Sequence, residues 1–521
     1  MRRLTGSRLL RLDCEELDGP EGCDEEDERG DDEPPEVLAR EVGPATWDQE
    51  RGREREDDED PRDHAKSHGV AGRDAEQHGP EPTRGRTLRD LSLAGTIVVV
   101  LEIFPATARV EGGELVVGGI RASALAAEFG TPLVVYDEST LLGSARAYLE
   151  AAPGAFVVYG TKAFSNATIL RLLTEQGLGA DVSTLGELEI ALLAGVPGER
   201  IVVHGNNKSD EELQAAARAG ARFVVIDALD EVERAEAAGV RRVLVRVTPG
   251  VEADTHPAIR TAHEGSKFGL PPEQAIEAIK QAKAAGLDVA GLHVHIGSQL
   301  MDSRAALTTV EWVAAFAARC SDELEWVPSV VDLGGGLGIQ YVEGEAPPSI
   351  ETFVGELTGH LAQQWAEHGL PAPELILEPG RSLVGRAGFT LYEVGTVKQV
   401  SDKTTFVAVD GGMSDNPRPQ LYDASYSGLL ANRADEEPDG TFIVCGKHCE
   451  SGDIMIRDLP LPAPRRGDLL AVPATGAYTL AMASNYNSVP RPAAVLVSNR
   501  KARLIRARET LGDLMRHDVL D

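Results

Sequence analysis

The stretch AFVVYGTKAFSNATILRLLTEQGLGADVS, residues 155–183, decides the fold. It opens with an apolar, β-branched run of strand length and continues through a segment whose apolar residues recur at helical spacing. It closes on a second short apolar run. A strand, a helix and a strand in this order form a βαβ unit, whose two strands lie parallel in one sheet.

The same alternation of strand and helix extends in both directions from this unit. The runs that we interpret as strands are PLVVYD (132–137), AFVVYG (155–160), GADVS (179–183), RIVVHG (200–205), RFVVID (222–227), RVLVRV (242–247), GLHVHIG (291–297), VVDLGGG (330–336) and ELILEPG (374–380). About eight such units without a dinucleotide-binding glycine fingerprint favour a (β/α)8 barrel over an open sheet. We expect this barrel to span residues 135–387.

A second domain follows the barrel. Residues 388–521 contain few helical patterns and several short apolar runs separated by polar turns, such as TTFVAVDGG (404–412) and AAVLVS (493–498). This sequence pattern predicts an all-β domain of antiparallel strands, arranged as a sandwich or a barrel. We expect residues 96–134 to contribute to the same domain.

The first 90 residues differ from the rest of the chain in charge. They hold 28 acidic and 15 basic residues, with stretches such as CDEEDERGDDEPPE (23–36) that have almost nothing to bury. Such a segment cannot offset its conformational entropy by burial, so we predict a disordered acidic extension over residues 1–95. An interaction tail and a translation start further along the chain are the alternatives.

The composition of the whole chain narrows the function classes. Of its 521 residues 42% are hydrophobic, and its net charge of −33 argues against binding to nucleic acid or to an anionic membrane surface. Five cysteines cannot form a disulfide framework, and no apolar run is long enough to span a bilayer. The N-terminus lacks the features of a signal peptide. We therefore expect a cytoplasmic protein.

In a barrel of this type the reactive groups lie at the carboxyl ends of the strands. The candidates at these ends are Lys162, Asp181, His204, His295 with Ser298, Gly334–Gly336, and Glu378 with Arg381. A lysine at a buried strand end loses solvation, which lowers its pKa and lets it attack a carbonyl to form a Schiff base. A barrel-rim lysine in water is the alternative for Lys162.

The histidines and glycines suggest a cofactor pocket. Strand alternation points His293 and His295 to the barrel interior, although a pair of hydrogen-bonded core histidines has the same pattern. The glycines of VDLGGG let backbone N–H groups approach a phosphate. In EPGRS, Glu378 could pair with a protonated ring nitrogen and Arg381 with a carboxylate, or the two side chains could form a structural ion pair.

The β domain adds the segment GKHCESGDI, residues 446–454. Cys445, His448 and Cys449 raise the question of a zinc site, but no second Cys/His pair with zinc spacing accompanies them. We expect no metal. Cys449 beside Glu450 is better interpreted as a thiol that passes a proton.

Together these groups match the requirements of pyridoxal phosphate. That cofactor needs a lysine for a Schiff base, a glycine-rich phosphate loop, a carboxylate for its pyridinium and a ring-stacking histidine, and it serves as an electron sink for carbanions at an amino acid Cα.

The chain also resembles the diaminopimelate decarboxylases, pyridoxal-phosphate enzymes with an alanine-racemase-like barrel and a C-terminal β domain. The resemblance runs from about Phe104 to near the C-terminus and is carried by motifs in family order. They are FPATARVEGGELVVGG, EFGTPLVVYD, YGTKAFSN, HGNNKSDEEL, HEGSKFGL, GLHVHIGSQ, VDLGGGLGI, EPGRS, CESGD and SNYNS. HGNNKSDEEL and CESGD are the specific motifs, whereas ornithine- and arginine-type decarboxylases share the lysine, histidine and EPGR elements. Gly160 stands where the family usually has alanine, and we expect no loss of function from it.

The resemblance implies a role for each matched residue. Lys162 would carry the cofactor, His295 would stack on its ring, and Glu378 would keep the ring nitrogen protonated. The remaining cofactor contacts would come from Asp181, Ser298, Gly336, Gly380, Arg381 and Tyr478. Cys449 would reprotonate Cα in the active site of the other subunit of a homodimer. The distal head of the substrate would be bound by Arg381, Arg418, Tyr422, Glu450 and Tyr478.

The activity implied is the decarboxylation of meso-diaminopimelate to L-lysine and CO2, the last step of lysine biosynthesis. Ornithine has no distal carboxylate and would leave buried arginines unpaired, at a cost of roughly 1–3 kcal/mol per group. The alternatives are a decarboxylase of carboxynorspermidine, ornithine or arginine, a catalytically dead homologue that binds a partner, and a cofactor-storage protein.

Overall fold

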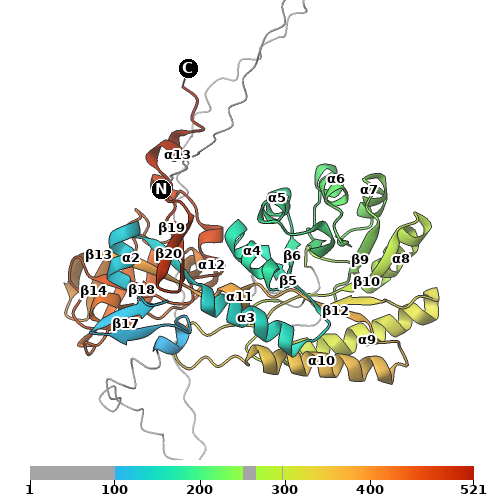
Figure 1. Cartoon of the computed structure of the whole chain (residues 1–521), viewed down its shortest axis with the longest axis horizontal. Coiled ribbons are helices and arrows are strands. Elements are labelled where there is room, and N and C mark those ends of the chain that lie inside the picture. The colour runs from blue at the N-terminus through green and yellow to red at the C-terminus, as the bar shows by residue number, and fades with distance from the viewer. Residues whose placement is uncertain (1–99, 250–265, 296, 521) are drawn as a thin grey trace, which may run out of the picture. The chain divides into compact units, whose positions relative to one another are not determined.

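The computed structural model describes residues 100–249, 266–295 and 297–520, and the predicted acidic extension lies outside them. In this part of the chain eight parallel strands close into a barrel, and a separate nine-stranded sheet forms a second domain (Figure 1). The predicted combination of a (β/α)8 barrel and an all-β domain is confirmed.

The barrel is built from consecutive strands, each hydrogen-bonded to the next. They are β5 (Phe156–Gly160), β6 (Gly179–Val182), β7 (Ile201–Val203), β8 (Phe223–Ile226), β9 (Arg242–Arg246), β10 (Asp288–His293), β11 (Val330–Asp332) and β12 (Glu374–Leu377), and β12 pairs with β5 to close the barrel. Side chains alternate between the barrel interior and the surrounding helices along each strand. In β5, for example, Phe156 and Val158 belong to the interior cluster, whereas Val157 and Tyr159 pack under the helices.

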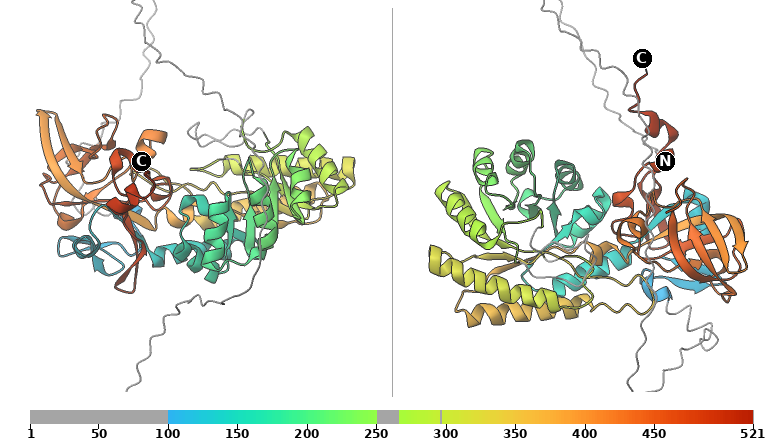
Figure 2. Two further views of the ribbon diagram at one scale, coloured as in Figure 1. Left: turned by 90° about the horizontal axis from the view of Figure 1, so that it is seen from above. Right: turned by 180° about the vertical axis from the view of Figure 1, so that it is seen from behind.

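Helices connect these strands and cover the outside of the barrel. They are α4 (Ala167–Glu175), α5 (Leu185–Ala194), α6 (Asp210–Ala219), α7 (Glu231–Ala237), α8 (Pro272–Ala284), α9 (Arg304–Leu324) and α10 (Ile350–Glu367), with the short α11 (Arg381–Val384) after β12. Local sequence fixes their ends, as in α6, where Ser209 and Glu212 form a capping box and Gly220 adopts a left-handed conformation. The two longest, α9 and α10, lie side by side (Figure 2). None of the described helices is both long enough and apolar enough to cross a membrane.

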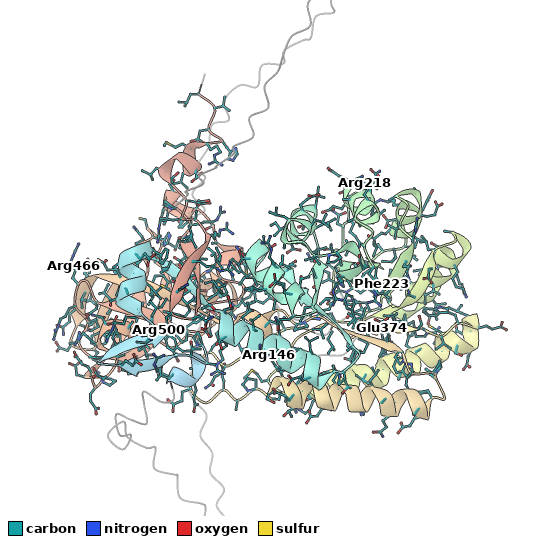
Figure 3. All side chains as sticks on the ribbon, in the orientation of Figure 1. Arg146, Arg218, Phe223, Glu374, Arg466 and Arg500 are labelled. Atoms are coloured by element: carbon teal, nitrogen blue, oxygen red, sulfur yellow. The ribbon has the colours of Figure 1, made fainter. Side chains whose placement is uncertain are left out.

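Aromatic rings and arginines close the amino-terminal end of the barrel. The guanidinium of Arg222 lies over the rings of Phe156 and Phe223 and pairs with Glu374 at 2.7 Å (Figure 3 labels Phe223 and Glu374). This end of the barrel is therefore packed.

The second domain contains the strand PLVVYD, which we had interpreted as a barrel strand. That interpretation is wrong, because β4 (Leu133–Asp137) pairs with β13 (Gly388–Ser401) and β19 (Ala493–Ser498) instead. The run is apolar on both faces, as a barrel strand is, so its sequence pattern could not separate the two placements. The helix that follows, α3 (Glu138–Ala151), packs against α10 and α4 on the barrel.

The other strands of this domain are β14 (Thr404–Val409), β15 (Leu429–Leu430), β16 (Gly440–Cys445), β17 (Ile454–Leu461), β18 (Leu469–Val472) and β20 (Lys501–Arg506), with α12 (Arg418–Tyr422) and α13 (Leu511–Met515) between or after them. Most pairs are antiparallel, as predicted, but β4–β19 and β14–β16 are parallel. In both parallel pairs the partner strands are far apart in the chain, so no hairpin turn forces them to run in opposite directions.

The segment before β4 packs against the same domain. It forms a three-stranded sheet of β1 (Arg109–Glu111), β2 (Glu114–Val117) and β3 (Ile120–Arg121), followed by α2 (Ala122–Phe129). Leu115, Val117 and Leu125 share one buried cluster with Phe389 and Val495 of the nine-stranded sheet.

Candidate active site

A ring of polar side chains lies at the carboxyl ends of the barrel strands, directly above the apolar interior. Strand alternation builds this ring, because each polar residue stands two positions after an inward apolar residue. The pairs are Val202 and His204, Val225 and Asp227, Leu244 and Arg246, Val330 and Asp332, and Ile376 and Glu378. The ring borders a cavity of about 690 Å³.

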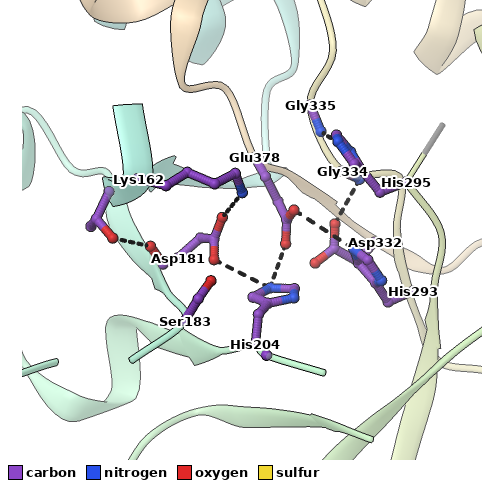
Figure 4. Close-up of polar contacts among 12 residues, drawn as sticks. Lys162, Asp181, Ser183, His204, His293, His295, Asp332, Gly334, Gly335 and Glu378 are labelled. Carbon is purple, nitrogen blue, oxygen red and sulfur yellow. Dashed lines mark hydrogen bonds and ion pairs between the residues drawn. The ribbon is translucent and has the colours of Figure 1, made fainter. Parts of the chain in front are cut away.

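Lys162 points into this cavity from the short helical turn Thr161–Ala163 that follows β5. Its Nζ lies 3.0 Å from Oδ2 of Asp181, and its side chain is 47% exposed, while that of Asp181 is buried (Figure 4). Desolvation disfavours the ammonium, but the nearby carboxylates of Asp181 and Glu378 outweigh it and raise the pKa of Lys162. The predicted fall of this pKa is therefore wrong for the arrangement seen here, since desolvation is only one of the two opposing effects.

Glu378 occupies the centre of the ring. Its Oε1 lies 2.6 Å from Nε2 of His204, and its Oε2 lies 3.6 Å from Nε2 of His293 (Figure 4). Burial opposes ionisation of this carboxyl group, but the two imidazoles overcome it and lower the pKa of Glu378 well below its usual range. The group is held as a carboxylate in a buried position.

Two buried neighbours of Glu378 also have shifted pKa values, that of Asp332 upward and that of His293 downward. Burial and the adjacent Glu378 raise the pKa of Asp332, whose Oδ1 accepts a hydrogen bond from the Gly334 N–H at 2.9 Å. Burial lowers the pKa of His293 to about 3, so its ring is neutral. The pKa values of these two buried carboxyl groups thus shift in opposite directions, that of Glu378 downward and that of Asp332 upward.

The same four residues could be considered as metal ligands. One ligand atom from each of His204, His293, Asp332 and Glu378 lies within 4.8 Å of the other three. In the structure both imidazoles face the carboxylate of Glu378, with Nε2 of His204 at 2.6 Å and Nε2 of His293 at 3.6 Å.

The glycine-rich segment after β11 lies against His295. A Cβ on Gly334 would come within 2.4 Å of Nδ1 of His295, and a Cβ on Gly335 within 2.3 Å of the carbonyl oxygen of Glu378. The Gly335 N–H points to Nδ1 of His295 at 3.3 Å. Glycine is therefore required for this close approach, and burial together with the Lys162 and Arg246 cations lowers the pKa of His295.

A second group of predicted residues meets near Arg381. Its Nη2 donates to Oγ of Ser298 at 3.0 Å, it donates to the hydroxyl of Tyr341, and its guanidinium lies 4.8 Å from the centre of the Tyr478 ring. The predicted ion pair between Arg381 and Glu378 is not among the contacts of either residue in the described part of the chain.

Most of the predicted residues border the one cavity. They are Lys162, His295, Ser298, Gly336, Glu378, Gly380, Arg381, Tyr422 and Tyr478. Arg418 is buried behind them, with its guanidinium 4.5 Å from the centre of the Tyr341 ring and its Nη1 2.6 Å from the Tyr426 hydroxyl. Its Nε–H has no acceptor among the described residues.

Cys449 and Glu450 do not border this cavity. Both are exposed on the loop between β16 and β17 in the β domain.

Sequence analysis missed several residues of the cavity. Arg246 and Asp332 occupy inward positions at strand ends, so the alternation that pointed to His293 also identifies them. Ser183, Glu187, Asn206 and Phe268 line the cavity from loops and helices, where no periodic signal marks them.

Comparisons with known proteins agree with this geometry. Residues 139–385 match the family described as pyridoxal-dependent decarboxylase, pyridoxal binding domain. The chain is 44% identical over 429 residues to the diaminopimelate decarboxylase of Halalkalibacterium halodurans, covering 80% of this chain and 98% of that protein. It is 43% identical over 443 residues to that of Actinosynnema pretiosum, covering 84% and 100%.

Solved structures give the same result. The crystal structure of diaminopimelate decarboxylase from M. jannaschii in complex with L-lysine aligns with a TM-score of 0.74 at 35% identity, covering 80% of this chain and 98% of that one. The Helicobacter pylori enzyme in complex with L-lysine aligns with a TM-score of 0.70 at 33% identity, covering 76% and 98%.

Proposed function

The chain belongs to the diaminopimelate decarboxylase family, and we propose from this premise how its residues carry out the reaction of these enzymes. That reaction is the pyridoxal-phosphate-dependent decarboxylation of meso-diaminopimelate to L-lysine and CO2, the last step of lysine biosynthesis. The observation that carries the assignment of roles is that Lys162 and the ionised Glu378 border one cavity with a glycine-rich segment.

The residues present fit pyridoxal phosphate. Lys162 would provide the amine that holds its aldehyde carbon, Glu378 would provide a carboxylate for its ring nitrogen, and His295 would present a flat ring to its face. The cradle left by the glycines at 334–336, with Ser298, Tyr478 and the backbone at Gly380 and Arg381, suits a phosphate. When bound, the cofactor supplies an electron sink for the charge that develops at the substrate Cα.

Asp181 and His204 orient the side chains of Lys162 and Glu378, the two residues that would contact the cofactor. Asp181 holds Nζ of Lys162 at 3.0 Å, which fixes the direction from which the amine reaches the cavity. His204 holds Glu378 at 2.6 Å and so keeps its charge at the barrel centre. An ionised Glu378 would stabilise a proton on the ring nitrogen of a bound cofactor, and so would strengthen the electron sink that the cofactor supplies.

Recognition of the distal head of the substrate is assigned to Arg381, Arg418 and Tyr422. Arg381 and Tyr422 border the cavity, and both arginines contact Tyr341. The buried Nε–H of Arg418 lacks an acceptor among the described residues, which fits a guanidinium that takes a carboxylate. A diamine precursor without that carboxylate leaves this donor unpaired.

Cys449 and Glu450 are assigned to the site of a second copy of the chain. Both are exposed and lie outside the cavity of their own barrel, as expected for residues that complete a neighbouring site in a homodimer. Cys449 would deliver a proton from Sγ to Cα after CO2 leaves, and Glu450 would pair with the distal ammonium.

We also place the protein in the cytoplasm, because the three described cysteines, Cys320, Cys445 and Cys449, are free thiols.

The experiment that tests this function offers meso-diaminopimelate, ornithine and arginine separately to the cofactor-loaded protein and identifies the products by mass spectrometry. We expect lysine from diaminopimelate and no turnover of the other two amino acids. Turnover of ornithine or arginine with none of diaminopimelate would overturn the assignment of the distal carboxylate site.

A further inference from the structure

The loop between β16 and β17, residues 446–453, has two buried side chains at its base and four exposed residues between them. His448 and Asp453 are buried, whereas Cys449, Glu450 and the two residues after them are exposed. We propose that His448 and Asp453 are positioning residues that fix Cys449 and Glu450 for the reaction. This inference rests on the roles proposed above for Cys449 and Glu450.

The contact between the two buried residues is direct. Nδ1 of His448 lies 2.7 Å from Oδ2 of Asp453, and the backbone N–H of His448 donates to the same oxygen at 3.0 Å. The carboxylate of Asp453, near the end of the loop, thus binds His448 near its start. A carboxylate that accepts several hydrogen bonds in a buried place is costly to remove, because its donors are left without partners.

The other oxygen of Asp453 binds a different loop. Oδ1 accepts the backbone N–H of Met413 at 2.8 Å. Two glycines make room for the carboxylate, since a Cβ on Gly446 would lie 2.1 Å from Oδ2 of Asp453 and a Cβ on Gly412 would lie 2.6 Å from the same atom. A larger residue than glycine at either position would therefore collide with the carboxylate of Asp453.

Met413 lies in the loop that leads into α12, the helix that begins at Arg418 and ends at Tyr422. Gln420 of this helix donates to the carbonyl oxygens of Gly452 and Ile454 at 3.1 and 3.0 Å. The loop 446–453 is therefore hydrogen-bonded both to Met413, just before α12, and to Gln420 within α12. These contacts couple the position of the loop to that of the helix.

A third segment supports the exposed end of the loop. The backbone N–H of Cys449 donates to Oδ1 of Asn487 at 2.8 Å, and the ring of Tyr486 stacks on that of His448 with 5.9 Å between their centres. This places Cys449 immediately beside a residue whose ring is held at its edge by Asp453 and on one face by Tyr486.

The test uses the full-length, cofactor-loaded protein and compares the variants Asp453→Asn, His448→Ala and His448→Asn with wild type. Misplacement of a reacting group by about 1 Å lowers turnover by up to about a hundredfold. We expect Asp453→Asn to lower kcat by about ten- to a hundredfold and to raise KM for diaminopimelate, because Cys449 and Glu450 move together. The absorbance of the bound cofactor should stay unchanged, since Lys162 lies in the barrel.

His448→Asn retains an amide N–H near the position of Nδ1, so it should restore part of the activity that His448→Ala loses. Asp439→Asn, which removes an exposed carboxylate just before β16, is the matched control and should behave as wild type. If Asp453→Asn does not fold, the two His448 variants alone decide the outcome.

Wild-type kcat and KM in His448→Ala would overturn the inference, as would equal losses in His448→Ala and His448→Asn. Cys449→Ala separates this failure from that of the proposed function. If Cys449→Ala turns over at the wild-type rate, the assignment of the proton donor is wrong, whatever the His448 variants do.

Discussion

Nε2 of His204 lies 2.6 Å from Oε1 of Glu378, and this contact holds a carboxylate ionised in the buried centre of the barrel. The two residues end β7 and β12, strands that are not neighbours in the barrel, so the closed sheet is what brings them together. A charge buried in this way is available to a cofactor ring nitrogen without competition from water.

Replacing Glu378 by Gln tests the value of that charge. The substitution keeps the size of the side chain and removes its negative charge, so cofactor should still bind while kcat falls by about a hundredfold. Steady-state kinetics with diaminopimelate, together with the absorbance of the bound cofactor, measure the two effects. Unchanged kcat in Glu378→Gln would show that the carboxylate does not assist the electron sink.

The neutral ring of His293 predicts how stability changes with pH. Burial lowers the pKa of His293 from 6.5 to about 3, so the unfolded chain binds a proton that the folded chain does not bind between these values. Stability therefore falls as pH is lowered through this range, by up to about 1.4 kcal/mol per pH unit for one such group. Thermal unfolding between pH 4 and 7 should show a shallower pH dependence for His293→Gln than for wild type. Parallel curves for the two proteins would refute this role of His293.

Two glycines form a matched pair for the geometry of the cavity. Gly335→Ala would place a Cβ 2.3 Å from the carbonyl oxygen of Glu378, so the segment must move and cofactor binding should weaken strongly. At Gly160, beside Asp181, the nearest atom to an added Cβ is 3.4 Å away, and the alanine should be tolerated. Titration of each apo-variant with pyridoxal phosphate measures the difference. Equal affinities would contradict the close packing of the glycine-rich segment.

Sequence alone predicted the barrel and most of the cavity for a physical reason. The period of two along a strand places Lys162, His293 and Glu378 at the open end, and no long-range information is needed to see it. The same pattern could not place PLVVYD, because a strand covered on both faces has the same sequence in either sheet. It also could not show the contact of Asp453 with Met413, which depends on how two loops of the β domain meet.

The charge states of the residues in the cavity also could not be predicted from the sequence. The pKa of Lys162 is raised because Asp181 lies 3.0 Å away, and that distance follows from the pairing of β5 with β6. Desolvation could be expected from the position of the lysine, but the stronger opposing charge could not.

The shared active site is tested most directly by mixing two inactive variants. Lys162→Ala should lose both the bound chromophore and activity, whereas Cys449→Ala should keep the chromophore and turn over slowly. If Cys449 serves the site of the partner subunit, subunit exchange between the two variants creates one intact site in each mixed dimer. Random exchange at equal amounts should then restore about a quarter of wild-type activity. Activity that stays at the level of the separate variants, with mixed dimers shown to be present, would contradict a site completed by the second subunit.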